Sequence, residues 1–217
     1  MDLFDKIEKY GRDRYGIEIA YKDESKFMQL LGKLLFFNKR FMTSYTTTIS
    51  DTVYFPSRDS VKQNRDTAAL VLGHELQHVN DAHKMTFPIF ALMYLSPQIF
   101  ALLAILAIWF SPLWLLALVC LLPIPSPGRT VLELHGYAVS TVLIRRWCSW
   151  RADCVSQFTT SAYYWMWPFS SPLINFFSKW DDCATSWAKP VKSTNGGNLL
   201  IDLTAIVDEH LKSVSKP

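Results

Sequence analysis

The stretch GHELQHVNDAH, residues 73–83, concentrates the side chains that could do chemistry: three of the chain's five histidines and one glutamate. On a helix, His74 and His78 lie one turn apart on the same face, so both imidazoles can reach one metal ion. Glu75 could then lean towards the open position of that metal, take a proton from a bound water and deliver it to a leaving amine. The HExxH spacing therefore predicts Zn²⁺ with Glu75 as general base. The alternative is a polar helix with incidental histidines.

A catalytic zinc site needs a third protein ligand besides two imidazoles, with water in the fourth position. The side chains that could supply it are His83, Asp81, Glu133 and His135. His83 follows His78 by five positions, which turns it off the shared helix face. Glu133 is favoured because it is the lone acid of the apolar run VLELHGYAV, and Gly136 permits a close approach of two helices. His135 is the rival ligand, and a solvated surface charge is the alternative role for Glu133.

The elements that must position these residues follow an α+β pattern. Residues 41–57, rich in β-branched and aromatic side chains with a turn signal at Ser50-Asp51, predict a β-hairpin ended by Pro56. Helical spacing of apolar residues predicts helices over Asp2–Tyr15, Asp23–Phe37, 64–84 with Asn64 as N-cap, 129–146 and Leu199–Val214. The hairpin would lie just before the HExxH helix, where an edge strand can hold an extended substrate.

No charged residue occurs between Met85 and Gly128. Within this block Ile89–Phe110 could form one helix interrupted at Ser96-Pro97, followed by a turn at Ser111-Pro112 and a second apolar run, Leu113–Leu122. The first run is long enough to cross a bilayer core of roughly 30 Å. We expect a membrane hairpin, spanning or re-entrant. Two helices buried in an oligomer core or a large interface are the alternative.

Four parts are therefore expected. Residues 1–84 would hold the N-terminal helices, the hairpin and the HExxH helix; 85–128 the hydrophobic hairpin; 129–153 the third-ligand helix; and 154–217 an aromatic-rich region with a closing helix. Residues 154–178 are uncharged and dense in aromatic side chains, which suits a membrane interface or a partner surface, with an aromatic core as the alternative.

Composition excludes some classes of protein. A net charge of +3, spread along the chain, gives no support to nucleic-acid binding. Four cysteines without a CxxC pair argue against a disulfide framework and against an all-cysteine metal site. The first residues, MDLFDKIEKYGRDR, lack an apolar core, so we expect no cleavable signal and a cytosolic amino terminus.

Residues 41–146 resemble the gluzincin zinc metallopeptidases, and HELQHVNDAH is similar to the HELxHxxxxH helix of their membrane-embedded branch, the HtpX-like and CAAX-prenyl proteases. The resemblance implies a minimal zincin-like core, Zn²⁺ held by His74, His78 and Glu133, and a hydrophobic hairpin inserted between the two zinc-ligand helices. Tyr137 replaces the aspartate that this branch places after the third ligand. Asp81 or Asn80 could take over its role of orienting a ligand histidine, and Tyr137 or His135 could stabilise the oxyanion.

If the three ligands meet at one ion, the chain between them leaves and returns to the same side of a membrane. Arg129, Arg145 and Arg146 lie at the open end of the hairpin with Lys84, which places the zinc site on the cytoplasmic face. The leading function is a membrane-associated zinc endopeptidase acting on a peptide or protein substrate, with lipid or a large assembly contacting 85–128 and 154–178. The competing function is a structural or assembly protein, such as a component of a virion, that keeps zinc to brace its fold.

Overall fold

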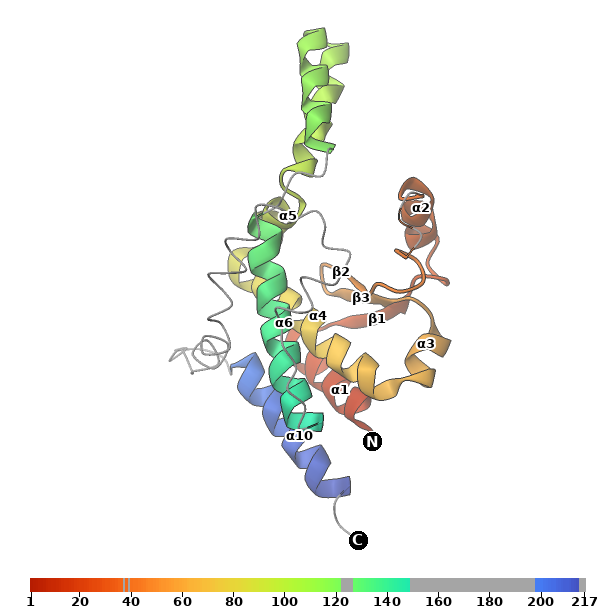
Figure 1. Cartoon of the computed structure of the whole chain (residues 1–217), viewed down its shortest axis with the longest axis vertical. Helices are drawn as coiled ribbons and strands as arrows, with labels where there is room; N and C mark the ends of the chain where they lie inside the picture. Colours follow the sequence, from red (N-terminus) through yellow and green to blue (C-terminus); the bar gives the residue numbers. More distant parts are fainter. Residues whose placement is uncertain (37, 39, 122–126, 149–197, 215–217) are drawn as a thin grey trace. The chain divides into compact units, whose positions relative to one another are not determined.

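The computed structural model describes residues 1–36, 38, 40–121, 127–148 and 198–214 (Figure 1). Its described residues are mostly helical with a small three-stranded mixed sheet, which agrees with the α+β class expected from the sequence. They fall into two compact units: 1–80 with 136–148 and 198–214, and 81–121 with 127–135. Two long helices, α4 (Arg65–Met85) and α6 (Pro127–Cys148), contribute residues to both. The aromatic segment 154–178 lies outside the described residues.

The sheet of the first unit contains β1 (Glu18–Tyr21), β2 (Thr47–Ile49) and β3 (Thr52–Phe55) in the order β1-β3-β2. β2 and β3 form the antiparallel hairpin expected within 41–57, with Ser50 in the left-handed conformation at its turn (φ 53°). β1 pairs in parallel with β3 and was not anticipated, because its four residues are too few to show a strand pattern. The order leaves β2 at one edge of the sheet.

Three shorter helices precede α4 in the first unit. α1 (Leu3–Tyr15) begins with a capping box between Asp2 and Asp5 and ends at Gly16, whose positive φ of 69° suits glycine. α2 (Lys26–Leu34) is shorter than the helix expected over Asp23–Phe37 and starts at Ser25, whose hydroxyl accepts from the Met28 amide. α3 (Arg58–Gln63) precedes α4 and was not expected from the sequence.

The core of the first unit is built from α1, α4, α6 and the C-terminal helix α10 (Leu199–Val214), which the sequence predicted with the same bounds. Its buried side chains include Leu3, Phe4 and Ile7 of α1, Leu72, Leu76 and Val79 of α4, Val139 and Leu143 of α6, and Leu199, Leu203 and Val207 of α10. A Cβ placed on Gly73 would lie 2.6 Å from Cδ1 of Leu143, so the absence of a side chain there lets α4 and α6 pack closely.

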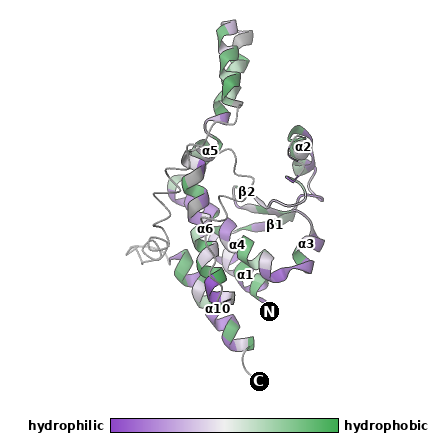
Figure 2. Cartoon of the chain, in the orientation of Figure 1, coloured by the Kyte–Doolittle hydropathy of each residue, from purple (hydrophilic) through white to green (hydrophobic). Residues whose placement is uncertain are grey.

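The second unit holds the apolar block: α5 (Phe87–Leu95) and two 3₁₀ helices, η1 (Gln98–Ile108) and η2 (Pro112–Leu121), that pack against each other. Many of its large side chains are exposed, among them Leu102, Trp109, Phe110, Leu113 and Leu116. Figure 2 colours this segment largely as hydrophobic. Within the part of the chain that the structure describes, no single helix has the length and apolarity of a membrane span, while Phe87–Leu95 and Gln98–Leu106 meet the criterion together, bent by 94° at the break expected at Ser96-Pro97.

Candidate metal centre

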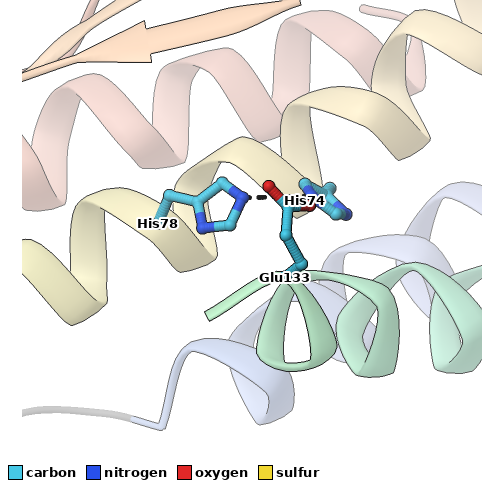
Figure 3. A group of neighbouring side chains, drawn as sticks. All are labelled: His74, His78 and Glu133. Atoms are coloured by element: carbon cyan, nitrogen blue, oxygen red, sulfur yellow. Dashed lines mark hydrogen bonds between the residues drawn. The ribbon is translucent and has the colours of Figure 1, made fainter. Parts of the chain in front are cut away.

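His74, His78 and Glu133 form the group of ligand-type side chains that could hold a metal ion among the described residues (Figure 3). One ligand atom from each lies within 4.8 Å of the others, and the Nε2 atoms of the two histidines are 3.1 Å apart. Two nitrogens bound to one tetrahedral zinc at about 2.0–2.1 Å would be roughly 3.3 Å apart. The imidazole pair therefore already has the spacing of metal ligands.

Gly136 sets how closely α6 approaches the histidine helix. A Cβ at this position would lie 2.6 Å from both Cε1 and Nε2 of His74, a distance that real Cβ atoms essentially never show. The ring of His74 therefore lies directly against the backbone of α6. Glu133 is three residues earlier on the same helix, hence about one turn away and on the same side. The small residue at 136 and the acid at 133 together bring a carboxylate towards the imidazoles.

The orientation of His74 is fixed through its other ring nitrogen. Its Nδ1 is 3.3 Å from the hydroxyl oxygen of Ser140, which also donates to the Gly136 carbonyl. The ring of Tyr137 meets the imidazole edge-on, with the centroids 4.8 Å apart. Holding Nδ1 in this way leaves Nε2 directed at the metal position, the arrangement that gives a ligand histidine one defined tautomer. Tyr137 thus contacts a candidate metal ligand. Ser140 belongs to no motif that could have identified it in the sequence.

Glu133 is 3% exposed, so its charge is removed from water and needs partners. Tyr94 of α5 donates a hydrogen bond of 2.5 Å from its hydroxyl to Oε1 of Glu133. Arg129 in turn donates from Nε to the Tyr94 carbonyl over 2.9 Å, and its guanidinium lies 4.9 Å from the centre of the Tyr94 ring. The carboxylate is therefore held by a tyrosine that sequence reasoning missed, because Tyr94 lies within the uncharged block and outside any recognisable motif.

Glu75, the residue next to His74 on α4, makes its hydrogen bond with the sheet. It is 8% exposed, and Thr48 of the edge strand β2 donates a hydrogen bond of 2.6 Å to its Oε2. One carboxylate oxygen is thus anchored by a neutral donor. The general base expected from HExxH therefore lies between the histidine helix and the strand edge, and Thr48 is a further site residue that the sequence did not reveal.

Lys22, just after β1, is fully buried. Its ammonium donates to the Phe41 carbonyl over 2.8 Å and lies 4.0 Å from the centre of the Phe41 ring. Burial lowers the pKa of Lys22 to about 8, and the negative charge of Glu75 acts in the opposite direction by favouring the protonated amine.

The other sequence candidates for the third ligand have different surroundings. Nδ1 of His135 is 2.8 Å from Oδ2 of Asp81, and this pair lies outside the metal-capable group. His83 is exposed near the end of α4. Asn80, considered with Asp81 for orienting a ligand histidine, accepts a hydrogen bond of 3.3 Å from the Tyr15 hydroxyl. Within the described residues, Glu133 is the acid that joins the two histidines.

Comparison of the chain with models of protein families, with curated proteins and with solved structures finds no match. The candidate site therefore has to be interpreted from its own residues. Two imidazole nitrogens and one carboxylate oxygen are a donor set that suits divalent zinc and, with three protein ligands, leaves the fourth tetrahedral position for water.

Proposed function

We propose that this protein is a membrane-associated zinc metalloendopeptidase in which His74, His78 and Glu133 hold Zn²⁺ and Glu75 is the general base. The proposal rests above all on one observation: two imidazoles from α4 and a buried carboxylate from α6 lie within reach of one ion. It includes a minimal zincin-like core with the hydrophobic hairpin inserted between the two ligand helices. The likeness of HELQHVNDAH to membrane-embedded gluzincins supports this assignment.

The bound ion would supply Lewis-acid polarisation of the scissile carbonyl and acidify the attacking water. The chain's own residues handle the proton. Glu75 takes it from the water and delivers it to the leaving amine, while Thr48 holds the opposite carboxylate oxygen at 2.6 Å and limits the rotation of the base. The Ser140 hydroxyl holds the ring of His74 through its Nδ1 atom.

The sheet supports a substrate of extended peptide. β2 lies at the edge of the sheet in the order β1-β3-β2, and Thr48 of this strand contacts the general base. A peptide that added to this edge as a further strand would run past Glu75, with main-chain hydrogen bonds providing affinity. Such binding recognises the main chain of the substrate more than its side chains, as expected of an endopeptidase that accepts several sequences.

Lipid contact is proposed for residues 85–128. The exposed apolar side chains of α5, η1 and η2 would be costly in water, and a bilayer core would cover them. The arginines and lysine at the open end of the block favour a zinc site on the cytoplasmic face. Contact with a large protein assembly is the alternative.

The decisive experiment compares the wild type with Glu75→Gln in both metal content and cleavage of a casein-like substrate. We expect one equivalent of zinc in each protein and at least a hundredfold loss of cleavage in the variant. Glu18→Gln, an equivalent change at an exposed position of β1, is the matched control and should cleave normally. Full cleavage by Glu75→Gln would rule out this mechanism.

A structural or assembly role is the second candidate. Two observations favour it. The Tyr94 hydroxyl donates a hydrogen bond to the carboxylate of Glu133, so a side chain of the protein itself contacts this candidate ligand. Tyr137 also stands where the membrane-embedded gluzincins have an aspartate. This function predicts tightly bound zinc, a large loss of stability on chelation and no hydrolysis by the wild type. Wild-type cleavage that disappears in Glu75→Gln would exclude it as the main role.

A further inference from the structure

Helix α2 exposes an apolar face that takes no part in the core. Phe27, Leu30 and Leu34 are 56%, 58% and 66% exposed, and Phe36, just past the helix, is 79% exposed. At about 100° per residue these three helix positions fall within one arc of roughly 60°. The opposite side packs inward: Met28 is buried, and a Cβ on Gly32 would meet Met42 at 2.7 Å. The helix is thus attached by one face while a second apolar face points outward.

The polar side of α2 is basic. Lys26 and Lys33 are exposed, and Arg40 beyond the helix is exposed as well. No aspartate or glutamate occurs from Ser25 to Ser50, although the chain as a whole contains 19 acids. The two lysines lie at the margin of the apolar arc, on the same side as Leu30. An apolar stripe bordered by cations is the pattern of a helix that lies in the headgroup region of an anionic bilayer.

Charge decides between the possible occupants of this face. A second copy docked symmetrically would bring like-charged lysines together, which disfavours self-association. Lysine is also depleted from protein–protein interfaces, whereas at an anionic membrane each basic side chain contributes favourably. The apolar side chains could enter the acyl boundary while the lysine stems reach up to the phosphates.

We propose that α2 with Phe36 is a membrane-surface contact for anionic lipid, separate from the hydrophobic block at 87–121. Phe27, Leu30 and Leu34 enter the headgroup–acyl boundary, and Lys26, Lys33 and Arg40 bind the anionic headgroups. This contact does not depend on metal binding or on proteolysis, so its test is independent of the test of the proposed function.

The test uses the full chain with its four cysteines replaced by serine and one new cysteine, Leu34→Cys, carrying an environment-sensitive fluorophore. Asp13→Cys, on the exposed surface of α1, carries the same label as the matched control. Each protein is reconstituted into vesicles of phosphatidylcholine alone or with 30% phosphatidylserine, with brominated lipids as depth-dependent quenchers. We expect a blue shift and quenching at position 34, stronger with phosphatidylserine, and neither at position 13.

A second variant tests the charges. Lys26→Gln/Lys33→Gln removes two cations from exposed positions, so folding should be unaffected. The double variant carries the label at position 34. In phosphatidylserine vesicles we expect its equilibrium constant for insertion of the label into the membrane to be about tenfold to thirtyfold lower than that of the labelled protein with both lysines. A label at position 34 that stays in water in both vesicle types overturns the proposal. So does a blue shift that depends on protein concentration and not on lipid composition, because it would identify a protein partner or a second copy.

Discussion

Gly136 leaves no room for a side chain beside His74: a Cβ on it would lie 2.6 Å from the Nε2 atom of the imidazole. The conflict is with the ring of a ligand-type residue, so a methyl group there must displace either that ring or α6. We therefore expect Gly136→Ala to weaken zinc binding by about tenfold to a hundredfold, the range typical of changes behind a metal ligand. Competition with a zinc chelator measures this, and Ala138→Ser on the same helix is the control. Equal affinities of Gly136→Ala and wild type would show that His74 does not bind the metal in this position.

Thr48 is expected to act through Glu75. Thr48→Val removes the hydroxyl that donates to Oε2 at 2.6 Å and keeps a branched side chain on the strand, so the base loses its anchor. We expect kcat to fall by roughly tenfold with an unchanged zinc content, and Thr48→Ser to restore most of the loss. Thr47→Val is the matched control, because neighbouring residues of a strand point to opposite faces. A rise in KM or a loss of metal with kcat unchanged would contradict a positioning role.

Lys22 makes the free energy of unfolding depend on pH in the alkaline range. Its pKa is lowered from 10.5 to about 8, so between these values the unfolded chain binds more protons than the folded chain, and raising the pH stabilises the fold. Relative to Lys22→Met, the wild type should gain about 3 kcal/mol of unfolding free energy from pH 8 to pH 10.5.

Urea unfolding of both proteins across this pH range provides the measurement. The comparison with Lys22→Met cancels the titration of every group that the two proteins share. A difference between them that stays constant with pH would mean that Lys22 keeps its ordinary pKa and hence that its ammonium is hydrated.

Much of the fold follows from local sequence signals. The hairpin within 41–57, the long helices around HExxH and Glu133, and the closing helix Leu199–Val214 have strong periodic patterns, and the structure contains them with shifts of a few residues at their ends. β1 and α3 escaped prediction because each is short. β1 exists through its pairing with β3, a contact that no local pattern encodes.

Some residues of the candidate site were likewise predictable from the sequence, and others were not. His74, His78 and Glu75 are specified by spacing on one helix, and Glu133 by its position as a lone acid in an apolar run beside a glycine. Thr48 and Tyr94 approach Glu75 and Glu133 across 27 and 39 residues of sequence. Such partners are set by tertiary packing, and a threonine in a strand or a tyrosine in an apolar helix carries no signal of its own.

The most direct test of this account is the zinc content of Glu133→Gln, which keeps the size of the side chain and removes its charge. Purified detergent-solubilised wild type and Glu75→Gln, a matched change at the neighbouring acid, should each retain one equivalent of zinc after dialysis against a weak chelator. Glu133→Gln should lose most of its metal, as should His74→Ala. One full equivalent of zinc in Glu133→Gln, bound as tightly as in the wild type, would contradict the assignment of Glu133 as the third ligand.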